Sequence, residues 1–136
     1  MWPPRYGDRV EPLPTVLCLN WVLFLAGVRA MAVLGAPPPL QALCCLQYVA
    51  ANAHQGFLFG TYSRAWRLAD WGGALTLSAA WLCAAATRLH MPQTVLLVAG
   101  GGGLTAWQMA APSRQAFAAR VNTWHAYAAA CVLLLG

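Results

Sequence analysis

The chain has 136 residues, of which 60% are apolar and only 8% are charged. Soluble domains carry about 25% charged residues, so this chain has too few charges for a water-facing shell, which argues against a soluble globular fold. The net charge of +5 comes from eight Arg against three acids, with no Lys. These Arg residues lie singly between apolar runs, which is typical of membrane-flanking anchors and argues against a nucleic-acid-binding face.

The beginning of the chain predicts an irregular arm followed by a first transmembrane helix. Residues 1–13 are polar and proline-rich, as in loops and surface segments. The apolar run at 14–34 is long enough to cross a hydrocarbon core of about 30 Å. Its start also resembles a signal peptide, with a cleavage-like sequence at 33–35, but the charged segment before it is long. We therefore interpret it as a retained span.

A second span is predicted at 40–62, after the prolines at 37–39 have stopped the first helix. This stretch is polar for a membrane helix, since it contains Gln41, Gln47, Asn52, His54 and Gln55. Polar groups at membrane depth face protein or a water-filled cavity. We therefore expect this helix to turn its polar side toward partner proteins or toward a polar cavity.

The remaining apolar runs predict three more spans, at 70–87, 93–111 and 121–136. Asp70 opens the third span, where the helix dipole favours a carboxylate. It is predicted to cap that helix and to form a local ion pair with Arg64 and Arg67. Only 16 residues remain for the fifth helix, so it is predicted to be short.

Small and amide residues predict where helices pack on one another. The fourth predicted span contains an unbroken glycine run, formed by Gly100, Gly101, Gly102 and Gly103. Small residues let membrane helices approach closely, and amides hydrogen-bond across them. The glycine run is therefore predicted to be a packing site, and Asn20 and Asn52 to be interhelical hydrogen-bonding groups. Alternatively, the glycines unwind the helix and expose carbonyls to a ligand.

Together these predictions describe an all-α integral membrane protein with about five transmembrane helices in a small bundle. The arm at 1–13 precedes a single transmembrane helical domain at 14–136. Five crossings put six Arg on the side of the arm and only Arg29 and Arg88 on the other. Since Arg-rich segments stay on the cytoplasmic side, the arm is predicted to face the cytoplasm or the mitochondrial matrix.

Two histidines are the sharpest candidates for chemistry. His54 lies near the middle of the second predicted span and His125 about one turn inside the fifth. Two imidazoles on facing helices are the axial ligands of haem b in many membrane proteins. The competing interpretation is that each His bonds to a carbonyl of a partner or to a lipid headgroup. We expect no cofactor, and haem b stays as the alternative.

The arginines next to the predicted spans are candidates for contact with lipid or with partner subunits. Basic pockets at membrane surfaces bind acidic phospholipids such as cardiolipin, and carboxylates of other proteins offer the same charge. The predicted contact residues are Arg29, Arg64, Arg67, Arg88, Arg114 and Arg120.

One short segment resembles a group of seven-span membrane hydrolases, the ceramidase and progestin-receptor-like proteins. Those proteins use a Ser, an Asp and several His around zinc, and their last motif, HxxxH, often ends in Trp-His. Here Trp124-His125 is similar to that ending, and His54 and Asp70 stand in the matching order. The resemblance implies a zinc hydrolase. However, Ala50 and Val121 replace a catalytic Ser and a ligand His, and the chain has too few spans, so we predict neither zinc nor hydrolysis.

No phosphate-binding loop, nucleophile motif or transporter repeat is present. We therefore predict a non-catalytic accessory subunit of a multi-subunit membrane complex, with a respiratory complex as first choice, that binds core subunits and lipids. The predicted location is the mitochondrial inner membrane with the arm in the matrix; a bacterial inner membrane or a thylakoid stays open. The rival functions are a haem b- or quinone-binding anchor in electron transfer and a small oligomeric pore or carrier.

Overall fold

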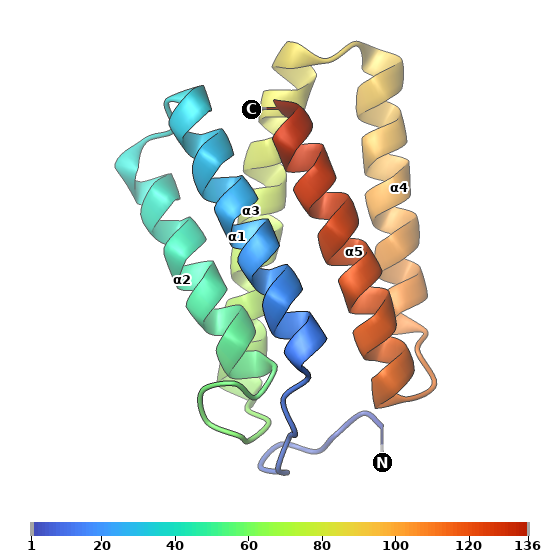
Figure 1. Cartoon of the computed structure of the whole chain (residues 1–136). Coiled ribbons are helices and arrows are strands. Elements are labelled where there is room, and N and C mark those ends of the chain that lie inside the picture. The colour runs from blue at the N-terminus through green and yellow to red at the C-terminus, as the bar shows by residue number, and fades with distance from the viewer. Residues whose placement is uncertain (1, 136) are drawn as a thin grey trace.

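The computed structural model describes residues 2–135, which form five α-helices (Figure 1). The helices are α1 (Pro14–Leu34), α2 (Pro38–His54), α3 (Arg64–Arg88), α4 (Met91–Met109) and α5 (Arg114–Leu135). They run alternately up and down, so the arm and the loops at 55–63 and 110–113 share one end of the bundle, called the arm end here. In this range the only β pairing is one isolated bridge between Arg9 and Thr61. The predicted all-helical class with five helices is confirmed.

Proline and glycine set several helix ends. Prolines occupy the first positions of α1, α2 and α4, where their missing N–H is not needed. Gly35 follows α1 with φ of +63°, a left-handed conformation that glycine adopts without strain. Gly56 and Gly60 also have positive φ, and α2 therefore ends at His54, eight residues before the predicted end at 62.

The prediction of a short fifth helix is wrong, because α5 has 22 residues and begins at Arg114. The segment predicted as a loop at 112–120 is mostly helical. The hydroxyl of Ser113 accepts a hydrogen bond of 3.2 Å from the backbone N–H of Ala116, which satisfies one free donor of the first turn. Helix α3 also starts earlier than predicted: it begins at Arg64, six residues before the predicted start at 70.

The helices pack as a ring in which α5 lies between α1 and α4, and α2 lies between α1 and α3. Small side chains make the α1–α5 contact, where Ala26 and Ala30 meet Ala129 and Val132. A second buried cluster joins α1, α2 and α3 through Met31, Cys44 and Leu77. Helix α4 contains no buried residue and contacts the bundle along one side only, against α5 and α3.

The arm is fastened to the loop between α2 and α3. The backbone N–H of Val10 donates to the carbonyl of Gly60, and the N–H of Gly7 to the carbonyl of Tyr62, both at 2.8 Å. Val10 is buried, and a Cβ on Gly56 would lie only 3.0 Å from the carbonyl oxygen of Val10. These contacts hold the arm across the arm end.

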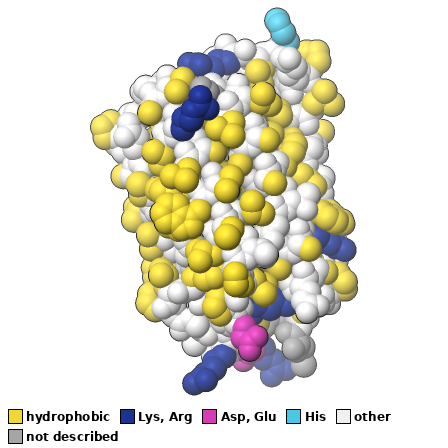
Figure 2. All heavy atoms as spheres, in the orientation of Figure 1, with side chains coloured by type: hydrophobic (Ala, Val, Ile, Leu, Met, Phe, Trp, Pro, Cys, Tyr) yellow, Lys and Arg dark blue, Asp and Glu magenta, His cyan; other side chains and the backbone are white. Residues whose placement is uncertain are grey.

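Apolar side chains cover the long sides of the bundle. Figure 2 shows hydrophobic side chains over the middle of the visible face, while the basic side chains gather mainly at the two ends and the acidic ones at the arm end. Of the described helices, only α1 is both long and apolar enough to cross a membrane, and a buried core helix or a signal sequence meets the same criterion. The fold is therefore a five-helix bundle, and five membrane crossings are not confirmed.

Candidate functional site

Three polar side chains of α2, those of Gln47, Asn52 and His54, bond to other helices of the same chain, whereas Gln41 is exposed and donates to the carbonyl of Ala36. The amide Nδ2 of Asn20 donates to Oδ1 of Asn52 at 3.0 Å, and both residues are buried. Nδ2 of Asn52 donates in turn to the carbonyl of Tyr48. The structure thus places Asn20 and Asn52 in an interhelical pair between α1 and α2.

A second buried polar group joins α2 to α3 around Asp70. Nδ1 of His54 donates to one carboxylate oxygen of Asp70 at 2.6 Å, and Nε2 of Gln47 donates to the other at 2.6 Å. The predicted role of Asp70 as a helix cap paired with Arg64 and Arg67 is wrong. The α3 helix starts a turn and a half earlier, so Asp70 lies inside it and faces α2. Within residues 2–135, the only side-chain ion pair is that of His54 and Asp70.

His125 lies on α5 and forms part of no such pair. Its ring packs edge-on against Trp124 at 5.7 Å, and its Nδ1 is buried without a hydrogen-bond partner in the described part of the chain. His54 lines the arm-end cavity described below, whereas His125 does not. Nδ1 of His54 is bonded to Asp70, which leaves Nε2 as its other ring nitrogen. No three His, Cys, Asp or Glu side chains of residues 2–135 group as a metal site.

A cavity of about 430 Å³, called the arm-end cavity, lies between the arm, α2, α3 and α5. Its volume falls within the range of small-molecule pockets. The polar side of its wall is formed by His54, Gln55, Tyr62, Arg67 and Arg114. The apolar side is formed by Trp2, Val10, Leu13, Trp71, Met109, Phe117 and neighbouring prolines and alanines.

Arg67 is held in this wall by uncharged groups. Its Nη1 donates to the hydroxyl of Tyr62 at 3.1 Å, and its guanidinium lies 4.4 Å above the ring centre of Trp71. Tyr6 stacks on Tyr62 with ring centres 5.2 Å apart and so supports this arrangement from the arm. A cation over an aromatic face keeps its charge, so the positive charge of Arg67 is oriented without being neutralised.

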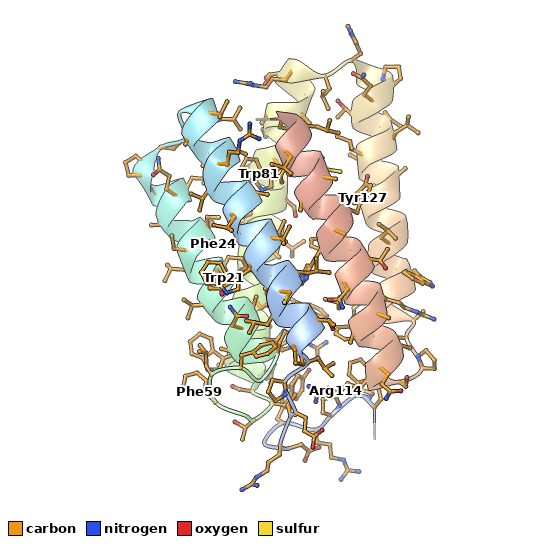
Figure 3. The ribbon with its side chains drawn as sticks, viewed as in Figure 1. Trp21, Phe24, Phe59, Trp81, Arg114 and Tyr127 are labelled. Atoms are coloured by element: carbon orange, nitrogen blue, oxygen red, sulfur yellow. The ribbon has the colours of Figure 1, made fainter. Side chains whose placement is uncertain are left out.

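Arg114 supplies a second guanidinium to the same cavity. It lies in the first turn of α5 (Figure 3), and its Nη2 donates to the backbone carbonyl of Glu11 in the arm. Near it, the rings of Trp2 and Phe117 lie 4.7 Å apart and close one side. The arm-end cavity thus combines two arginines with aromatic and aliphatic walls.

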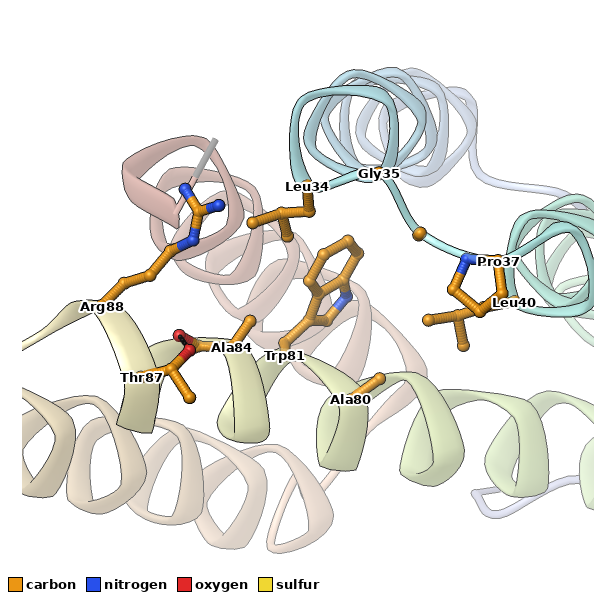
Figure 4. A pocket seen from close by; sticks show the side chains of 10 residues that line it. Leu34, Gly35, Pro37, Leu40, Ala80, Trp81, Ala84, Thr87 and Arg88 are labelled. Atoms are coloured by element: carbon orange, nitrogen blue, oxygen red, sulfur yellow. Dashed lines mark hydrogen bonds between the residues drawn. The ribbon is translucent and has the colours of Figure 1, made fainter.

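The opposite end of the bundle has a second cavity, of about 310 Å³, between α1, α2 and α3. Figure 4 shows Trp81 between Leu34 and Leu40, with Arg88 at the edge. Arg88 donates to the carbonyl of Leu135 at 3.3 Å, so its guanidinium is engaged by the end of α5. This cavity offers one cation and few polar partners.

The other predicted lipid- or partner-contact arginines lie outside both cavities. Arg29 and Arg64 are exposed, and Arg120 lies over the ring of Trp107 and donates to its carbonyl at 2.6 Å. The glycine run divides in two. Gly100 faces Tyr127 of α5, and Gly101 lies near the same ring, whereas Gly102 and Gly103 face open space.

Sequence reasoning missed the binding partners of the arm-end residues. Arg67 and Trp71 are four residues apart on α3, a spacing that puts them on one helix face, so that stacking was detectable. Tyr62 gave no local signal, because residues 55–62 were predicted to belong to the second span. The arm residues gave none because they are far from α3 in the sequence. The comparisons with known proteins add no family: no protein-family model, no curated protein and no solved structure matches this chain.

Proposed function

We propose that this chain is an integral membrane protein whose five helices all cross the bilayer, and that it serves as a non-catalytic subunit of a larger membrane assembly. The observation that carries the proposal is the distribution of side chains: two hydrogen-bonded polar groups, Asn20–Asn52 and His54–Asp70–Gln47, lie inside the bundle, and large apolar side chains lie outside. Water-soluble bundles show the reverse distribution.

Every helix presents a largely exposed leucine to the surroundings. The exposed fractions of these side chains are 57%, 65%, 72%, 70% and 73% for Leu25, Leu46, Leu75, Leu96 and Leu134. Monomeric soluble proteins rarely expose large continuous apolar surfaces. In a bilayer, lipid tails would cover the exposed apolar side chains of all five helices and so remove the free-energy cost of exposing them to water.

The low apolarity of α2 and α3 is compatible with crossing a membrane, because several of their polar side chains are hydrogen-bonded within the chain. Asn52 of α2 bonds to Asn20 of α1 and to the carbonyl of Tyr48. His54 and Gln47 of α2 both bond to Asp70 of α3. Intramembrane polar residues face the bundle interior and pair with one another. Helix α2 has 17 residues, or about 26 Å at the α-helical rise, which is close to the thickness of the hydrocarbon core.

Helix α4 supports the subunit role. It buries none of its residues within the chain, and Gly102 and Gly103 leave its outer side open. Small residues at such a position allow another membrane helix to approach closely. We propose an energy-transducing complex such as a respiratory one, in the mitochondrial inner membrane with the arm toward the matrix; this choice rests on size, composition and the distribution of Arg.

The five crossings can be tested with cysteines. Cys18, Cys45 and Cys83 are exposed on α1, α2 and α3, and Leu96→Cys and Ala130→Cys add exposed positions on α4 and α5. On a cysteine-free background, each single cysteine is expected to resist a water-soluble maleimide in sealed vesicles and to react fully in SDS. The physical reason is that lipid covers these positions.

Leu58→Cys and His90→Cys are the matched controls, since they lie in exposed loops at opposite ends. They should be labelled from opposite sides of the vesicle. Reaction of the helix cysteines at the rate of the loop cysteines would remove the membrane proposal. The subunit role requires other polypeptides to co-purify with the native protein in mild detergent. A chain that purifies alone, with a Soret band that is lost in His54→Ala or His125→Ala, would replace this role by the haem-anchor alternative.

A further inference from the structure

We propose that the arm-end cavity binds the phosphate headgroup of an anionic lipid, with Arg67 and Arg114 as its cationic ligands. The choice of a lipid as the source of the phosphate rests on the membrane location proposed above. The lining of the cavity and its two arginines do not depend on that location.

Two guanidinium groups line this cavity without a carboxylate bonded to either. Arg67 bonds to the hydroxyl of Tyr62, and Arg114 bonds to a backbone carbonyl of the arm. Both carboxylate oxygens of Asp70, the acid on α3, accept hydrogen bonds from His54 and Gln47. Within residues 2–135 neither Arg67 nor Arg114 has a carboxylate oxygen within 4.0 Å. The carboxylate of Glu11 interacts electrostatically with Arg114 from a longer distance, but it does not line the cavity, whose described wall contains two arginines and no acid.

The geometry of each guanidinium suits a phosphate. Arginine presents five N–H donors in a planar fork and binds phosphate oxygens in pairs. The hydrogen bonds to Tyr62 and Tyr6 both use Nη1 of Arg67, which leaves the donors of its other nitrogens for a ligand. Stacking on Trp71 fixes the plane of that guanidinium, so less freedom is lost when the ligand binds.

The apolar part of the wall distinguishes a lipid from a free anion. The rings of Trp2 and Phe117 are in contact on one side, at an interplanar angle of 41°, and Leu13 and Met109 also line the cavity. Apolar surface of this kind suits the glycerol and first acyl carbons of a lipid and gives a free anion nothing to bind. The cavity also lies at the helix ends, where the headgroups of a surrounding bilayer would be, and basic pockets between membrane helices bind anionic headgroups there.

Binding to the purified full chain in a neutral detergent tests the proposal. The probe is a short-chain phosphatidylglycerol, with phosphatidylcholine and inorganic phosphate as comparison ligands, measured by native mass spectrometry and calorimetry. We expect phosphatidylglycerol to bind with one-to-one stoichiometry and to weaken at least about tenfold in the double variant R67Q/R114Q, because charge-assisted hydrogen bonds are lost. The control R5Q/R64Q removes two exposed arginines of the arm and α3 that do not line the cavity, and should bind within about twofold of the parent chain.

Several outcomes overturn the inference. Equal weakening in R5Q/R64Q would reduce the effect to general surface charge, and equal binding of phosphatidylcholine would show that the anion is not recognised. Inorganic phosphate competing as well as the lipid would assign the site to a free anion. If R67Q/R114Q loses its helical circular dichroism, the test is made on the parent chain by measuring phosphatidylglycerol binding at rising salt concentration. Binding that does not weaken in high salt would exclude the arginines as ligands. If phosphatidylglycerol does not bind but the helix cysteines are protected from the maleimide, only the lipid site is excluded. If the helix cysteines react, the membrane proposal itself is excluded.

Discussion

Replacing Asp70 by Ala is expected to lower the unfolding free energy by about 2–4 kcal/mol, because two buried donors lose their acceptor. Nδ1 of His54 and Nε2 of Gln47 both donate hydrogen bonds to this carboxylate. His54 is buried, and the side chain of Asp70 is 14% exposed, so neither donor is readily reached by water. The loss should separate α2 from α3 before the other helix pairs.

Unfolding in a mixed-micelle SDS titration, followed by circular dichroism, measures this change. Asp70→Asn keeps one acceptor oxygen and should cost less than Asp70→Ala. Asp8→Ala is the control, since this exposed carboxylate accepts only the backbone N–H of Arg5 and should change stability by less than about 0.5 kcal/mol. If Asp70→Ala were as stable as the parent chain, the His54–Asp70–Gln47 group would not hold the two helices together.

Substituting Gly100 by Leu should separate α4 from α5, while the same substitution at Gly102 should be tolerated. A Cβ on Gly100 would lie 2.5 Å from the hydroxyl oxygen of Tyr127 and 3.0 Å from its ring carbon Cζ. That hydroxyl donates to the carbonyl of Leu97 at 2.8 Å. Overpacking costs about 1–3 kcal/mol, and the lost hydrogen bond adds about 1 kcal/mol.

Gly102→Leu is the matched control because nothing lies within 4 Å of its Cβ position. In the same SDS titration we expect Gly100→Leu to unfold earlier and Gly102→Leu to equal or exceed the parent chain, since Leu favours helix over Gly. The two variants also distinguish packing of α4 against α5, which involves Gly100, from contact with a partner protein, which would involve Gly102. Loss of co-purifying subunits in Gly102→Leu, at full stability, would show that the open side of α4 binds a partner helix. Equal destabilisation by both variants would contradict the packing described here.

The existence of five helices followed from the apolar runs, but several of their ends did not. Helix α1 begins and ends where the hydropathy pattern predicts, because Pro14 and Gly35 mark both ends. Helix α5 starts seven residues before its apolar run, since Arg114 and Arg120 lie at the surface on a helix that is already formed. Apolar runs show which residues avoid water, and a helix can extend beyond them at either end.

Of the candidate site, the sequence indicated the residues but not their partners. The polar side chains of α2 were predicted to face partner proteins or a polar cavity; Gln47, Asn52 and His54 bond to helices of the same chain, and Gln41 is exposed. However, the pairing of His54 with Asp70 depends on how α2 and α3 lie side by side, and no local spacing encodes it. The stacking of Arg67 on Trp71 follows from one helical turn, whereas the contribution of Tyr62 required the loop at 55–63 to leave the helix.

The walls of the arm-end cavity come from regions that are far apart in the sequence, from the arm to the first turns of α5. A ribosome therefore delivers Trp2 and Leu13 long before Arg114 and Phe117, and an incomplete nascent chain contains only half of the enclosure. The pocket closes when the last hairpin docks against α1. The arm-end cavity can therefore form only after α5 has been made and has packed against α1.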